Sequence, residues 1–207
     1  MNIDCKKNHD EFVSLLRASK RQGIEQLIKY LESTDFFVAP CSTRFHLSEP
    51  GGLCQHSLNV FDAANLFSEA YRFQDNMHAD GVYYTFDDIS VLIVSLLHDV
   101  CKTNCYKSEL RWRKDDNNQW EQYGTYTKDE DYAFGHSEKS VYIVSKFIKL
   151  TDVEAQAING HMGFSDSRGL QLIGNIFKQN SLALLLHSAD MYATYIIENE
   201  RVNLDEK

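Results

Sequence analysis

The segment that begins at Asp87, "DDISVLIVSLLHDV", constrains the fold most strongly, because apolar side chains cover nearly every side of it. Such all-round apolar character is typical of a helix buried in the centre of a protein. Asp87 is expected to cap this helix, since its carboxylate can accept bonds from free N–H groups of the first turn. The segment ends in His98 and Asp99. Burying an aspartate there is costly unless a cationic group meets it.

Apolar residues recur at helical spacing in several other parts of the chain. The residues between 33 and 52 are expected to form a loop instead, because both prolines and two adjacent glycines fall there. No repeat or linker divides the chain, so residues 1–207 are predicted to form a single domain. The helices expected from the spacing cover residues 12–31, with an interruption near Gly23, and residues 51–67, 135–150, 151–160 and 181–200.

The pattern changes between Cys105 and Tyr132, where aromatic and polar residues alternate around an Asp-Asp-Asn-Asn turn. This predicts a β-hairpin insertion over about residues 105–132. Its basic residues, interleaved with Trp112 and Trp120, could hold phosphates and stack bases. The alternative, which acidic neighbours favour, is a solvated flap whose tryptophans pack on the helices. Either form could act as a lid.

Charge and composition limit the partners that the chain can take. The formal net charge is −9, so the overall field repels long nucleic acids but leaves a small phosphorylated substrate open. The longest apolar stretch is too short to span a bilayer and no secretory signal opens the sequence. We therefore expect a cytoplasmic protein with no membrane partner, whose five cysteines are reduced. The sequence leaves the oligomeric state open.

Histidines and aspartates on the core-facing sides or at the ends of the expected helices form one candidate site. His56, for example, shares an apolar stripe with Leu53 and Val60. Taken singly, each has an ordinary explanation as a satisfied core residue or a cap. Together they are the imidazole and carboxylate ligands that divalent metals require. The candidate metal ligands are His56, His98, Asp99, His136, His161 and Asp190.

The order of these residues resembles the ligand series of the HD-domain metal-dependent phosphohydrolase superfamily. The motifs "FHLSEPGGLCQHS", "LLHDVCK", "GHS", "INGHMGF" and "LLHSADMYA" are most similar to the HD domain of the YhaM-type 3'-to-5' exoribonucleases, whose OB domain has no counterpart here. The resemblance implies an all-α HD-domain helical bundle that carries the hairpin as an insertion. It also implies that His56, His98, Asp99 and Asp190 hold one metal ion, while His136 and His161 complete a second site that Asp99 bridges.

By the same resemblance, about two divalent ions per chain would activate a water for attack on phosphorus. The candidate ions are manganese, cobalt, nickel, zinc and iron, with magnesium as a further candidate. Asp99 and Lys102 are the predicted catalytic residues, and Lys102 could also hold a phosphate oxygen; the alternative for Lys102 is an ordinary surface lysine. Arg44 and His46 are candidate substrate contacts, although Arg44 could equally pair with a surface carboxylate.

Two further expectations concern neighbours of the candidate ligands. Gly51 and Gly52 suit a tight loop at a helix start, where free N–H groups could face an anion. His187 lies three residues before Asp190 and could orient that carboxylate, although ordinary packing is favoured.

Three functions therefore remain in view. The favoured one is a metal-dependent phosphohydrolase, an enzyme that cleaves a phosphoester of a nucleotide or a similar small phosphorylated substrate. The second is a 3'-to-5' nuclease or phosphodiesterase acting on short nucleic acid. The third is a non-catalytic nucleotide-sensing module, for which some lost ligands would be expected. The same ligands would also serve a di-iron oxygenase.

Overall fold

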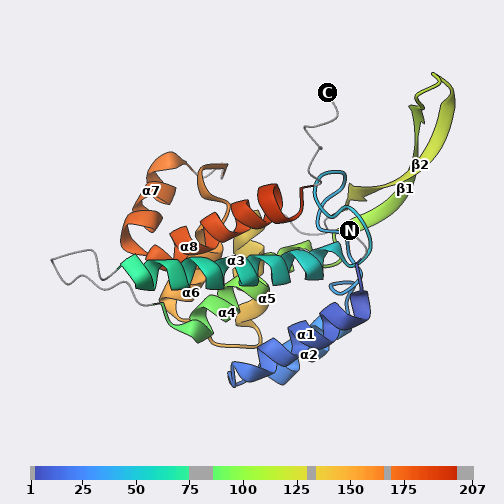
Figure 1. The fold of residues 1–207 in the computed structure, drawn as a ribbon. Helices are drawn as coiled ribbons and strands as arrows, with labels where there is room; N and C mark the ends of the chain where they lie inside the picture. The colour runs from blue at the N-terminus through green and yellow to red at the C-terminus, as the bar shows by residue number, and fades with distance from the viewer. Residues whose placement is uncertain (1–2, 75–85, 130–133, 166–168, 200–207) are drawn as a thin grey trace.

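The structure is a computed structural model, which describes residues 3–74, 86–129, 134–165 and 169–199. It is mostly helical with a small antiparallel hairpin, which confirms the predicted fold class (Figure 1). The helices are α1 (Cys5–Ala18), α2 (Ile24–Glu32), α3 (Gly52–Gln74), α4 (Asp88–Leu97), α5 (His136–Ser145), α6 (Asp152–Gly160), α7 (Leu170–Gln179) and α8 (Ser181–Tyr192), and the strands are β1 (Tyr106–Lys114) and β2 (Trp120–Lys128).

Helix α4 lies at the centre of the molecule, as its all-round apolar character predicts. Every residue from Val91 to Leu97 is buried, and α4 contributes to both apolar clusters of the core. One cluster joins it to α1, α2 and α5, and the other joins it to α6, α7 and α8, while α3 runs along both. Asp87 caps α4 by accepting a hydrogen bond from the Ser90 N–H. The His98–Asp99 pair is thereby held at the buried end of a fixed helix.

Helix α6 is anchored by a buried glutamate at its first turn. Thr151 and Glu154 form the predicted capping box, and the same Glu154 carboxylate forms a two-point ion pair with Arg21, which lies between α1 and α2. Ser90 Oγ on α4 donates a further hydrogen bond to it at 2.8 Å. These contacts tie three parts of the bundle together, and α6 ends at Gly160, directly before His161.

We expect Glu154→Gln to lower the free energy of unfolding by about 2–3 kcal/mol, because it removes one charge of a buried, hydrogen-bonded ion pair. The Glu154 side chain is 0% exposed and its Arg21 partner 23% exposed. The matched control is Glu25→Gln, which breaks a solvent-exposed pair with Arg17. Urea unfolding of the two variants measures the difference. Equal effects would show that Glu154 does not anchor α6.

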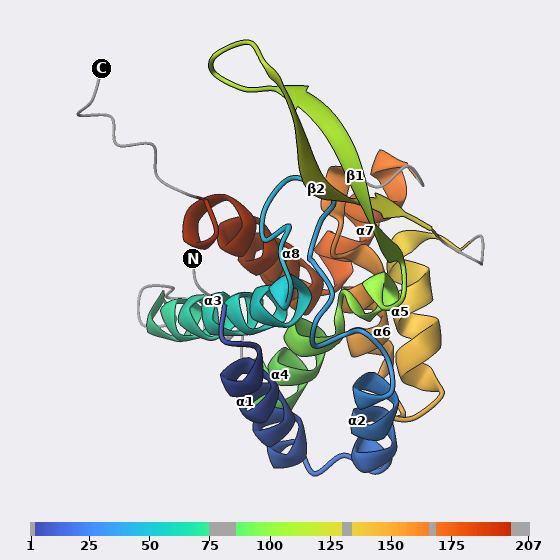
Figure 2. The same ribbon diagram turned by 90° about the vertical axis from the view of Figure 1, so that its right-hand side faces the viewer.

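The hairpin projects away from the helices in both views (Figures 1 and 2). Its strands pair from Tyr106–Lys128 to Lys114–Trp120, and the turn closes where the Asp115 N–H donates to Gln119 O. The expectation that its tryptophans pack on the helices is wrong, since Trp112 is 61% and Trp120 65% exposed. The predicted insertion extends to residue 132, and residues 130–132 lie outside the described residues.

The loop before α3 needs its two glycines for steric reasons. Gly51 has a φ of +83°, and a Cβ on Gly52 would lie 2.1 Å from Leu47 O. The predicted anion-facing N–H groups are not free, because Gly51, Gly52 and Leu53 donate to the carbonyls of Val38, Glu49 and Ala39. Hydrogen bonds therefore tie the start of the helix to the preceding loop, and the expectation that these N–H groups face an anion is wrong.

Several element boundaries differ from the sequence expectations. Helix α5 ends at Ser145 instead of continuing to 150. Helix α8 ends at Tyr192 and passes into a π-helical turn, Ala193–Ile197. Helix α7 was missed, although Ile173 and Ile176 are its buried residues and lie at helical spacing. None of the helices within the described residues combines the length and apolar character needed to cross a membrane.

Candidate metal centre

The six predicted ligands converge on one place, although they come from five separate elements. His56 lies in α3, His98 and Asp99 follow α4, His136 begins α5, His161 follows α6 and Asp190 lies in α8. Overlapping sets of their nitrogen and oxygen atoms lie within 4.8 Å of one another. The cluster is buried on one side, where His56, His98 and His161 are at most 1% exposed, while Asp190 and His136 border solvent.

Asp99 is the residue that connects this cluster. Its Oδ1 lies 2.8 Å from His136 Nε2 and 3.6 Å from His161 Nε2. Its Oδ2 lies 3.5 Å from His98 Nε2, 3.7 Å from His56 Nε2 and 2.7 Å from Lys102 Nζ. Each carboxylate oxygen thus faces its own group of nitrogens, which is the arrangement that a bridging carboxylate needs.

Backbone carbonyls fix which nitrogen of two histidines faces the cluster. His98 Nδ1 lies 2.8 Å from Ser95 O, and His161 Nδ1 lies 2.7 Å from Ile158 O. Because a carbonyl can only accept, Nδ1 carries a proton in both rings. Nε2 of each ring is thereby turned to the cluster, as in metal-binding histidines whose other nitrogen is held by a backbone group.

The Glu198 side chain holds the Nδ1 side of the His56 ring and so turns Nε2 towards the cluster. Its Oε1 lies 2.9 Å from His56 Nδ1 and accepts a second hydrogen bond from Asn59 Nδ2 at 2.9 Å. Burial raises the pKa of Glu198, but the His56 charge and these hydrogen bonds outweigh it and lower the pKa, so the carboxylate stays ionised. His56 Nε2 is left facing Asp190 Oδ1 at 3.2 Å. Sequence reasoning missed Glu198, because no local pattern links it to a residue 142 positions away.

Glu198→Gln is expected to weaken divalent metal binding by about tenfold, because the loss of an outer carboxylate partner lets the histidine ring turn and lowers its basicity. Calorimetric titration of the metal-free protein with Zn²⁺ measures the change. Glu49→Gln is a suitable control, since that exposed residue lies in the neighbouring loop. Unchanged affinity in Glu198→Gln would show that Glu198 does not position His56.

Opposite charges inside the cluster shift the pKa values of its members strongly. Burial raises the pKa of Asp99, but Lys102 and the surrounding histidines outweigh burial and hold it well below its usual range. Burial lowers the pKa of His136, but the hydrogen bond to Asp99 outweighs that effect and raises it to about 9. The charged carboxylate is therefore balanced by cations that a bound metal would replace.

This balance predicts that metal affinity rises with pH. His136 must lose its Nε2 proton to become a ligand, and its pKa of about 9 in the metal-free protein means that protons compete with the metal below that pH. Burial lowers the pKa of His56, but its charged neighbours, Glu198 and Asp190 among them, outweigh burial and hold it well above its usual value. Two ligands must therefore lose a proton, so affinity for Zn²⁺ should rise by more than tenfold and up to about 100-fold per pH unit between about pH 7 and 9. Calorimetric titrations across this range measure it, and an affinity independent of pH would contradict the proposed ligand role of His136.

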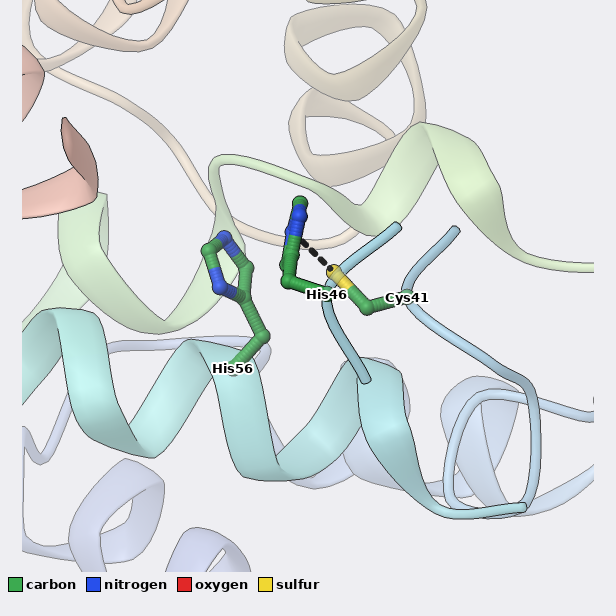
Figure 3. A group of neighbouring side chains, drawn as sticks. All are labelled: Cys41, His46 and His56. Carbon is green, nitrogen blue, oxygen red and sulfur yellow. Dashed lines mark hydrogen bonds between the residues drawn. The ribbon is translucent and has the colours of Figure 1, made fainter. Parts of the chain in front are cut away.

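The predicted substrate residues lie in different surroundings. Lys102 is 14% exposed and bonds to Asp99, and its Nζ lies 3.4 Å from Cys41 Sγ. His46 Nε2 lies 3.3 Å from Cys41 Sγ, beside the His56 ring (Figure 3). Burial, followed by the His56 charge, lowers the pKa of His46 to about 4. Arg44 is exposed, with its guanidinium 5.3 Å from the centre of the Phe45 ring.

His187 behaves as the packing residue that the sequence favoured. Its Nδ1 lies 2.7 Å from His161 O, and its ring stacks on Phe177 with centroids 5.4 Å apart. A Cβ on Gly163 would lie 2.3 Å from the same ring. His187 thus holds the segment that carries His161 by a hydrogen bond to the main-chain carbonyl of His161.

The donor set fits a divalent metal ion. Neutral imidazole nitrogens and carboxylate oxygens suit manganese, iron, cobalt, nickel and zinc, and buried charged groups are those that pair with one another or coordinate a metal. Comparison of the chain with protein-family models, with curated proteins and with solved structures found no significant match in any of the three. The assignment of the cluster as a candidate metal centre therefore depends on its own geometry.

Proposed function

We propose that the chain is a metal-dependent phosphohydrolase of the HD-domain superfamily, which cleaves a phosphoester of a nucleotide or another small phosphorylated substrate. The observation that carries the proposal is Asp99, whose two oxygens face Nε2 atoms of four histidines beside the buried ammonium of Lys102. Bound divalent ions would supply Lewis acidity and lower the pKa of a bound water towards neutrality.

The chain's own residues have distinct parts in this function. Asp99 would join the metal positions, and His56, His98, His136, His161 and Asp190 would complete them. Lys102 Nζ pairs with Asp99 Oδ2, and the same ammonium could contact a phosphoryl oxygen of a substrate held beside that carboxylate. The open side at Asp190 and His136 is where a substrate could enter, because these ligands are 20% and 26% exposed.

Activity can be tested with two chromogenic esters, p-nitrophenyl phosphate and bis(p-nitrophenyl) phosphate, followed by a panel of nucleotides. The protein is freed of metal, reloaded with one divalent cation at a time and compared with Asp99→Asn. The matched control is Asp62→Asn, an exposed aspartate on α3. Metal-dependent release of p-nitrophenol by the wild type and Asp62→Asn, but not by Asp99→Asn, supports the function. No turnover with any metal or ester would overturn it.

The second candidate is a nuclease or phosphodiesterase acting on short nucleic acid, and the exposed hairpin favours it. Lys114 Nζ lies over the Trp120 ring, 5.6 Å from its centre, and Arg113 lies over Tyr123 at 5.0 Å. Exposed aromatics beside basic groups can stack bases. Against it, Arg113 is already paired with Glu121 and Arg111 with Glu109. Degradation of a short oligonucleotide, lost in a Trp112→Ala, Trp120→Ala double variant, would place this function first.

A further inference from the structure

Cys101 lies inside the candidate metal centre, although no sequence pattern marks it as a ligand. It occupies the short 3₁₀ turn Val100–Lys102 and is 2% exposed. Its backbone N–H donates to Ser140 Oγ at 3.0 Å, which fixes the turn against α5. The thiol is therefore held at the cluster by the fold and is not free to turn towards solvent.

The sulfur faces the same residues that would hold a metal. Cys101 Sγ lies 3.3 Å from His136 Nδ1 and 3.6 Å from His136 Nε2. Donor atoms of Asp99, Cys101 and His136 all lie within 4.8 Å of one another. A tetrahedral zinc ion with bonds of about 2.1 Å to nitrogen and about 2.3 Å to sulfur separates those two atoms by about 3.6 Å. The Nε2–Sγ separation is close to that value, but Sγ lies nearer to Nδ1, so the His136 ring has to turn about its Cβ–Cγ bond before Nε2 and Sγ can bind one ion.

A second thiol, Cys41, belongs to a similar group with His46 and His56 (Figure 3), but it is less suited to a cation. The Lys102 ammonium lies 3.4 Å from Cys41 Sγ, so this thiol already has a cation beside it. His56 also has no nitrogen left for a separate ion there, because Glu198 engages Nδ1 and the main centre takes Nε2. The comparison singles out Cys101.

We propose that Cys101 is a thiolate ligand of the metal centre and shares one cation position with Asp99 and His136. The inference rests on the proposed metal centre and names a ligand that the imidazole and carboxylate set does not include. On binding, the S–H bond breaks, the proton leaves to solvent and a sulfur–metal bond forms, with no change of oxidation state. Because thiolate is a soft ligand, this position selects zinc, cobalt or iron over manganese and magnesium.

Cobalt(II) is the probe, since a thiolate ligand adds a near-ultraviolet charge-transfer band that nitrogen and oxygen ligands do not produce. The metal-free full-length protein, Cys101→Ser and Cys41→Ser are each titrated with Co²⁺, and bound cobalt is measured by equilibrium dialysis. We expect the band in the wild type and Cys41→Ser and its loss in Cys101→Ser. The preference for Zn²⁺ over Mn²⁺ should fall by at least about tenfold in Cys101→Ser, in line with the effect of losing a group that supports a metal site.

The outcomes separate this proposal from the function. Cobalt that binds the wild type without the band, or a band lost in Cys41→Ser instead, overturns the role of Cys101 and leaves the metal centre and the phosphohydrolase standing. If no cobalt binds to the wild type, both the role of Cys101 and the metal centre itself are overturned. If Cys101→Ser does not fold, X-ray absorption of zinc-loaded wild type and Cys41→Ser decides the matter: sulfur at about 2.3 Å from zinc in both supports Cys101, and its absence from Cys41→Ser overturns it.

Discussion

Replacing Asp99 with asparagine is expected to lower divalent metal affinity by at least about 100-fold, and with it all metal-dependent phosphoester cleavage. Loss of even an outer partner of a metal ligand costs about 10–100-fold, and Asp99 is the carboxylate that faces both halves of the cluster. Asparagine keeps the shape but removes the charge that the nearby histidines and Lys102 balance. Metal content after dialysis and calorimetric titration with Zn²⁺ measure the effect.

The control for this variant must separate lost binding from lost folding. Asp99 is 3% exposed, so its replacement leaves the Lys102 ammonium without its buried partner and destabilises the protein. The double variant Asp99→Asn, Lys102→Met removes both charges and should recover stability without recovering metal binding. Near-normal metal affinity in folded Asp99→Asn would contradict a bridging role.

Lys102→Met is expected to lower kcat/KM by about 100-fold while the protein keeps its metal. Removing one preorganised positive or hydrogen-bonding group from the charge that develops in a transition state costs about 10²–10³ in rate. The Nζ of Lys102 is 2.7 Å from Asp99 Oδ2, so it also competes with a cation for that oxygen. Metal affinity in Lys102→Met should therefore rise, in the opposite direction to activity.

A rise in metal affinity together with a fall in kcat/KM distinguishes a substrate-binding lysine from a merely structural one. If Lys102 only neutralised Asp99, its replacement would strengthen metal binding and leave kcat/KM unchanged. Lys102→Arg keeps the positive charge and should retain part of the activity, because a guanidinium also binds phosphoryl oxygens. Steady-state kinetics on the best chromogenic ester, together with metal content, test both variants.

The elements that carry the candidate site could be predicted from local patterns. The apolar run from Val91 to Leu97 fixed a central helix, and the Thr151–Glu154 spacing fixed the start of α6. These features depend on burial and capping, which act within a few residues of one another. The hairpin was equally local, since an Asp-Asn turn between alternating strands is enough to define it.

The parts that escaped prediction depend on contacts distant in sequence. Glu198 contacts His56 from 142 positions away in the sequence. Cys101 becomes a candidate ligand only because the start of α5 brings His136 beside it. The exposed tryptophans were placed wrongly for a related reason. The alternation of aromatic and polar residues predicts a hairpin, but it does not predict whether either face of the hairpin packs against a helix. Here the hairpin projects beyond the helices and both tryptophans are exposed (Figure 2).

The central claim is that the buried histidine–aspartate cluster binds metal, and elemental analysis of the wild-type protein tests it most directly. The protein should be purified without chelator and under low oxygen, and one portion stripped and reloaded with each candidate ion. The account predicts about two tightly held divalent ions per chain, removed by chelator and recovered on reloading. A protein that holds no metal before or after reconstitution would contradict it.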